Sequence, residues 1–127
     1  MRFELIDRVE ERDADRIVAV KNVSAAEEYL GDHFPGFAVL PGVMMLEAMV
    51  QAARHLLAGR EEPGPWVLAE VRNLRYGNMV RPGQQLRVEV AIKKAEAGRF
   101  AFQGSGQVGS ESAVQGRFVL RRLQSGA

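Results

Sequence analysis

The second half of the chain alternates apolar and polar residues in the pattern of a sheet with one wet face. From Leu86 to Lys93, every even position holds an aliphatic residue, and three of the four odd positions hold a charged one. Successive side chains of a strand point to opposite faces, so this period of two predicts a strand with one buried face. Four strands are predicted after Pro65, with hairpin turns at the EAGR and GSES segments: residues 66–76, 84–96, 99–108 and 112–123.

Two shorter strands are predicted near the N-terminus. Phe3–Glu11 and Arg16–Val23 are mixed segments that flank the turn-like ERDAD sequence, which together predict a hairpin. A capping-box pattern at Ser24 then predicts a helix of one or two turns that ends at Gly31.

A longer helix is predicted in the middle of the chain. Pro41 and Gly42 open it, because the missing N–H of proline would have no partner in a first turn anyway. It runs to about Ala58, where Gly59 and the REEPGP sequence end it. Its apolar residues lie on every face for three turns, which is typical of a helix enclosed by other structure. One such helix and about six antiparallel strands predict an α+β fold in which the sheet curls around the helix.

Composition and charge narrow the class of protein. With 46% hydrophobic and 26% charged residues, the chain resembles a globular protein. A net charge of +1 gives no overall electrostatic case for binding nucleic acid or membrane. The absence of cysteine excludes disulfides and thiolate metal sites, and the start MRFELIDRVEERD has no apolar run like that of a signal peptide. We expect one domain over residues 1–127, with 123–127 as a frayed tail, in the cytoplasm.

The candidate chemistry gathers at the start of the long helix. From Phe34 to Ala53, Glu47 is the only charged residue. A carboxylate buried among apolar side chains loses its hydration, so it is kept only where it has a partner or a function. His33 precedes it by fourteen positions in a loop, and the first-turn N–H groups, including that of Gly42, have no partners within a helix. A base, an acid and a polarising amide are therefore predicted at one helix end. Burial favours the neutral form of Glu47 and the helix end favours the charged form, so the sequence leaves its charge state open.

Simpler interpretations exist for each of these residues. A single histidine such as His33 more often packs or hydrogen-bonds than catalyses. Glu47 alone could equally form a buried structural hydrogen bond. His55 is interpreted as a surface or dimer-contact residue, and the methionines as core side chains.

A longer stretch, KNVSAAEEYLGDHFPGFAVLPGVMMLEAMVQAA, resembles the β-hydroxyacyl-acyl carrier protein dehydratases of the FabZ type, which have the hot-dog fold. The family pattern is a histidine in HFPG, a PGV turn, and a glutamate in EAMAQ fourteen residues after the histidine. Here these are His33, Pro41-Gly42-Val43 and Glu47. FELIDRV and NLRYGNMVRPGQQL are similar to further family segments, so the resemblance covers nearly the whole chain.

The resemblance implies dehydration of (3R)-hydroxyacyl thioesters to trans-2-enoyl thioesters in fatty acid biosynthesis, without metal or organic cofactor. It implies a homodimer, or a trimer of dimers, in which His33 of one subunit faces Glu47 of the other. His33 would remove the C2 proton, Glu47 would help the C3 hydroxyl leave, and the Gly42 N–H would bind the thioester carbonyl. Phe34 and Val43 would contact the acyl chain in a tunnel between the subunits.

The implied partner is an acyl carrier protein. Because carrier proteins are acidic, we expect cationic side chains near the tunnel mouth, and Arg72, Arg75 and Arg81 are the candidates. The alternative interpretation is that these three arginines simply lie on a solvated strand edge and bind no partner.

Two other functions fit the same sequence. One is a hot-dog thioesterase, or a dehydratase of a specialised lipid or polyketide pathway, although the retained HFPG and EAMVQ sequences argue against a thioesterase. The other is a non-catalytic acyl-binding homologue. Departures from the family pattern at Asp32, Ala38 and Arg72 motivate this last hypothesis, and retention of His33 and Glu47 argues against it.

Overall fold

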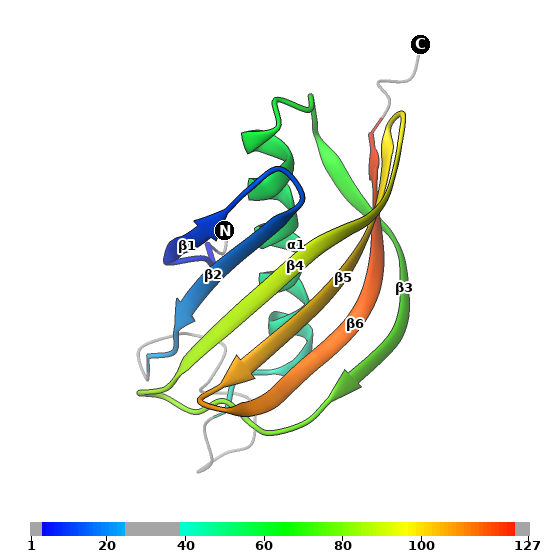
Figure 1. The fold of residues 1–127 in the computed structure, drawn as a ribbon. Helices are drawn as coiled ribbons and strands as arrows, with labels where there is room; N and C mark the ends of the chain where they lie inside the picture. The colour runs from blue at the N-terminus through cyan, green and yellow to red at the C-terminus, as the bar shows by residue number, and fades with distance from the viewer. Residues whose placement is uncertain (1–3, 25–38, 124–127) are drawn as a thin grey trace.

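The computed structural model describes residues 4–24 and 39–123, which hold one helix and six strands (Figure 1). The short helix predicted after Ser24 and the tail from residue 124 lie outside these ranges. The helix is α1 (Gly42–Gly59), and the strands are β1 (Arg8–Arg12), β2 (Arg16–Asn22), β3 (Trp66–Tyr76), β4 (Gln85–Glu96), β5 (Arg99–Val108) and β6 (Glu111–Arg122).

All six strands form one antiparallel sheet in the order β1-β2-β4-β5-β6-β3. The prediction of six antiparallel strands is confirmed, as are both hairpin turns between β4, β5 and β6. Strands β1 and β3 form the edges. The pairing of β3 with β6 is irregular between Leu68 and Glu70 and again between Arg72 and Arg75, and such bulges bend a sheet and increase its twist. The curved sheet passes α1 on one side (Figure 1), so the predicted hot-dog arrangement is confirmed.

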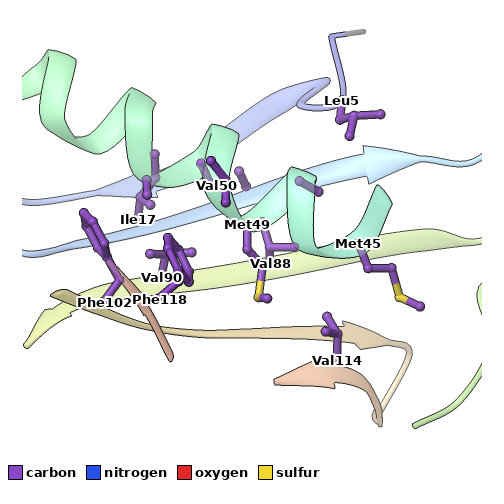
Figure 2. Close-up of a cluster of buried hydrophobic side chains, with 14 of the residues drawn as sticks. Leu5, Ile17, Met45, Met49, Val50, Val88, Val90, Phe102, Val114 and Phe118 are labelled. Atoms are coloured by element: carbon purple, nitrogen blue, oxygen red, sulfur yellow. The ribbon is translucent and has the colours of Figure 1, made fainter. Parts of the chain in front are cut away.

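The core lies between the inner face of the sheet and one side of α1. Figure 2 shows Met45 and Met49 of the helix pointing toward the sheet, whose inner face carries Val114, Phe118 and Phe102. The rings of Phe102 and Phe118 stack with centroids 5.2 Å apart. Burying side chains of this size removes a large apolar area from water, which is the main favourable term in folding.

The helix comes unusually close to the sheet at Gly104 of β5. A Cβ atom at this position would lie 2.8 Å from the sulfur of Met49 and 3.1 Å from the Phe118 ring. Only glycine leaves room for both side chains without a shift, so the sequence of β5 sets the depth at which α1 packs.

The helix has the predicted bounds, but the prediction that it is enclosed on every side is wrong for this single chain. Met45, Met49 and Leu56 are buried, whereas Val43 is 63% exposed and Leu46 is partly exposed. One sheet covers only one side of a helix, so the opposite stripe of α1 remains open. Within residues 4–24 and 39–123, no helix is long and apolar enough to cross a membrane.

We predict that Phe102→Ala lowers the free energy of unfolding by about 3–5 kcal/mol, because it opens a cavity between α1 and the sheet. Phe102 is 1% exposed, belongs to the core cluster that includes Met49 of the helix, and stacks on Phe100 and Phe118. Urea denaturation monitored by circular dichroism measures the change. Gln107→Ala, an exposed position on the same strand, serves as the control and should change stability by less than about 0.5 kcal/mol. Equal effects of the two substitutions would contradict this account of the core.

Candidate active site

The first turn of α1 presents two backbone donors. Pro41 caps the helix with extended backbone angles, φ −61° and ψ 145°, and its carbonyl accepts the N–H groups of Met44 and Met45. The N–H groups of Gly42 and Val43 make no hydrogen bond to any residue in the described part of the chain. Because the helix dipole also places partial positive charge here, this end of α1 can stabilise a developing negative charge.

Tyr76, at the end of β3, packs directly on this helix start. A Cβ atom at Gly42 would lie 2.8 Å from the Tyr76 ring, so glycine permits the close approach of ring and backbone. The ring is 49% exposed, and its partial burial raises the pKa of the phenol. The sequence analysis did not single out Tyr76, because the contact joins two segments that are far apart in the chain.

Glu47 lies in the second turn of α1, as predicted, but the apolar burial expected for it is absent in the single chain. Its side chain is 40% exposed. Its Oε1 atom lies 3.4 Å from Nε2 of Gln51 and 3.5 Å from Nη1 of Arg54. Its Oε2 atom has no hydrogen bond or ion pair with any described residue. One oxygen is therefore held and the other is available to a ligand.

Gln51 and Arg54 are functional candidates that the sequence analysis missed. They follow Glu47 by four and seven residues, so the helical repeat places all three on one stripe of α1. Their other contacts come from distant segments: the Leu5 N–H donates to Oε1 of Gln51 at 2.8 Å, and Nε of Arg54 donates to the Trp66 carbonyl at 3.1 Å. The helical spacing was visible in the sequence, whereas these distant partners were not.

A groove of about 610 Å³ runs along this stripe. Its apolar part is lined by Val43, Met44, Leu46 and Leu68 of β3, and its polar part by residues that include Glu47, Gln51, Arg54, His55 and Glu4. His55 is half-exposed, with Nε2 4.0 Å from a carboxylate oxygen of Glu4, so its predicted surface position is confirmed. The groove joins an apolar surface to a carboxylate, as an acyl substrate with a polar reacting end requires.

His33 and Phe34 lie outside the described residues, together with Asp32 and Ala38. The residues on either side of this segment are placed. The Val23 N–H donates to the Gln84 carbonyl at 3.0 Å, and the Leu40 N–H donates to the Val80 carbonyl at 2.7 Å. Both ends are therefore held by the connection between β3 and β4.

The three arginines proposed to contact a carrier protein lie apart from the groove. Arg72 is on β3, with its side chain 71% exposed and paired with Glu70. Arg75, also on β3, lines a shallow polar hollow beside Arg117, and Arg81 lines a separate hollow in the connection between β3 and β4. The structure does not bring the three together around one opening in the single chain.

Comparison with known proteins shows the family of the chain. A family model described as ApeI-like, ApeI dehydratase, matches residues 9–117. The 3-hydroxyacyl-[acyl-carrier-protein] dehydratase FabZ of Variovorax paradoxus is 40% identical over 96% of this chain and 85% of its own length. The protein of the same name from Pseudothermotoga lettingae is 36% identical over 91% of this chain and 78% of its own length.

Solved structures share the fold. The dehydratase heterocomplex ApeI:P from Xenorhabdus doucetiae contains a chain with a TM-score of 0.75 at 19% identity, covering 96% of this chain and 84% of that one. A mutant of the fluoroacetyl-CoA-specific thioesterase FlK has a TM-score of 0.71 at 18% identity, covering 91% of this chain and 87% of its own. Because the family model and the curated relatives match most of its length, the chain belongs to the family of ApeI-like and FabZ-type dehydratases.

Proposed function

We propose that this protein removes water from (3R)-hydroxyacyl thioesters carried on acyl carrier protein and releases trans-2-enoyl thioesters for fatty acid biosynthesis. Relatives that match nearly the whole chain are named for this dehydration. The observation that carries the proposal is the groove along α1, into which Glu47 brings an oxygen, Oε2, that has no partner among the described residues. At the start of the same helix, the N–H groups of Gly42 and Val43 also have no partner among those residues.

The chemistry divides among three groups. The C2 proton is only weakly acidic, and its removal places negative charge on the thioester carbonyl oxygen. The Gly42 N–H is positioned to bind that oxygen, where a fixed donor helps most in the transition state. His33 takes the C2 proton as general base, and Glu47 in its acid form gives a proton to the C3 hydroxyl, which leaves as water. Phe34 and Val43 contact the acyl chain near the reacting carbons.

A second copy of the chain completes the proposed site. Strand β3 is an edge of the sheet, and the apolar side chains of Val43, Leu68 and Val71 are exposed along it and along the open stripe of α1. A homodimer that pairs along β3 would cover the groove, exclude water from Glu47 and bring His33 of one subunit to Glu47 of the other. The proposal extends to a trimer of such dimers, with the cytoplasm as its setting.

The proposed macromolecular partner is the acyl carrier protein. Neither Arg75 nor Arg117 forms an ion pair within the described residues, so this part of the outer sheet face carries two cations without a paired carboxylate there. We keep Arg72, Arg75 and Arg81 as candidate contacts, since a cationic surface speeds the encounter with an acidic partner. A second candidate is the same dehydration in a specialised lipid or polyketide pathway, because the ApeI-like family model names a dehydratase without naming its substrate.

Glu47→Gln should lower the rate of enoyl formation about 100- to 10,000-fold, because the glutamine amide cannot donate the proton that the leaving hydroxyl needs. Purified protein is mixed with a 3-hydroxyacyl thioester, and enoyl absorbance and thiol release are followed together. Glu96→Gln, an exposed glutamate at the end of β4, is the matched control and should retain the wild-type rate. Thiol release without enoyl formation would identify a thioesterase instead.

A mixing experiment tests whether each site is shared between subunits. His33→Asn and Glu47→Gln homodimers should both be inactive. After the two proteins are unfolded and refolded together, about half of the dimers are mixed, and each mixed dimer has one intact site. Activity should therefore return to about a quarter of the wild-type value. If both residues act within one subunit, no mixed dimer has an intact site and the mixture stays inactive.

The dimer itself is tested by Leu68→Glu. A carboxylate at this position would be buried without a partner in the proposed interface, at a cost of several kcal/mol. Size-exclusion chromatography with light scattering should find the wild-type protein at least dimeric and the variant monomeric, and the variant should be inactive. Ala97→Glu, in the hairpin between β4 and β5, should leave the assembly unchanged. Circular dichroism checks that the variant is folded, and a monomeric wild-type protein with full activity would exclude this interface.

A further inference from the structure

Arg54 connects the candidate catalytic acid to the sheet. Its Nε atom donates to the Trp66 carbonyl at 3.1 Å, and its Nη1 atom lies 3.5 Å from Oε1 of Glu47. We propose that Arg54 is a positioning residue, which ties the Glu47 carboxylate to the first residue of β3 and leaves Oε2 as the atom that meets the substrate. This inference rests on the proposed function, because it assigns a role toward the same reaction.

The anchor of Arg54 is a fixed part of the fold. Trp66 is 6% exposed, and its ring packs edge-on against Phe100 with centroids 5.3 Å apart. Its backbone carbonyl, at the first residue of β3, is therefore held in place by a packed side chain. A planar guanidinium can bind this carbonyl through Nε and a carboxylate through Nη1 at the same time, in a geometry that a lysine ammonium cannot reproduce.

The two carboxylate oxygens of Glu47 differ in their contacts. Gln51 and Arg54 both contact Oε1, and Gln51 is itself held by the Leu5 N–H at 2.8 Å. A long hydrogen bond from Gln51 and the positive charge of Arg54 act on the same oxygen, so together they favour one orientation of the carboxylate. Oε2 has no partner in the described part of the chain, so it is the oxygen available for proton transfer.

The other charged groups in the groove do not share this role. His55 lies next to Arg54 in sequence, but its nearest carboxylate is that of Glu4, at 4.0 Å. Within residues 4–24 and 39–123, Arg54 is the only cationic side chain within 4.0 Å of Glu47. In the single chain this ion pair is about 40% exposed and contributes little to stability, so the expected effect of Arg54 is on turnover.

The test compares Arg54→Met with Arg54→Lys and with Arg8→Met, which removes an exposed arginine of β1 that does not line the groove. Methionine keeps most of the length of the side chain but neither contact, so kcat should fall about tenfold while KM stays within about twofold. Lysine can reach only one of the two acceptors and should recover part of the rate. Arg8→Met should match the wild type in rate and in unfolding midpoint, and the Arg54 variants should remain folded with only the small loss of stability expected from one part-buried hydrogen bond.

A double-mutant cycle shows whether Arg54 acts through Glu47. In the Glu47→Gln background, Arg54→Met should lower the residual rate by less than about twofold, because the carboxylate that it positions is already gone. A full tenfold loss in that background, a change in KM alone, or a wild-type kcat for Arg54→Met would each overturn the inference while leaving the proposed function intact.

A measurement without turnover separates the two proposals. The ¹³Cδ resonance of Glu47, identified by its absence in Glu47→Gln, should shift in Arg54→Met and not in Arg8→Met. A wild-type protein that forms no enoyl product would overturn the proposed function, and the resonance would still report on the contact. An unchanged resonance in Arg54→Met would overturn the positioning role whatever the activity.

Discussion

The packing of α1 against the inner face of the sheet is the contact on which the rest of the structure depends. Met45, Met49 and Leu56 bury one side of the helix against strands that carry Phe102 and Phe118. Gly104 lets the helix approach closely enough for these side chains to interlock. Because side chains in a core have few alternative arrangements, this contact also fixes the rotation of α1 about its own axis.

That rotation decides what the helix presents to solvent. With one stripe buried, the opposite stripe carries Glu47, Gln51 and Arg54 into the groove. Two of these polar residues are tied to different parts of the chain, Gln51 to the N-terminal segment at Leu5 and Arg54 to the start of β3 at Trp66. The same packing that stabilises the fold therefore orients the Glu47 carboxylate.

The start of the helix adds the second component of the site. Pro41 leaves the N–H groups of Gly42 and Val43 without partners in the described residues, and the Tyr76 ring closes over Gly42 from the end of β3. The connection between β3 and β4 accepts hydrogen bonds from Val23 and Leu40, which lie within two residues of the ends of the segment that contains His33. The start of α1, the Glu47 carboxylate and the two ends of the segment that contains His33 therefore lie on the same side of the molecule, where the proposed dehydration would develop its negative charge.

Most of the elements could be predicted from the sequence. The period of two in β4 and the proline and glycine at the start of α1 depend on local stereochemistry, so neighbouring residues predict them. The pairing of His33 with Glu47 rests on the resemblance to a family and stays a prediction. The tertiary structure decided which stripe of α1 is covered, and it corrected the expectation that apolar neighbours bury Glu47. It also supplied the partners of Glu47, because contacts such as that of Arg54 with Trp66 form only when the packing of helix and sheet brings separate segments together.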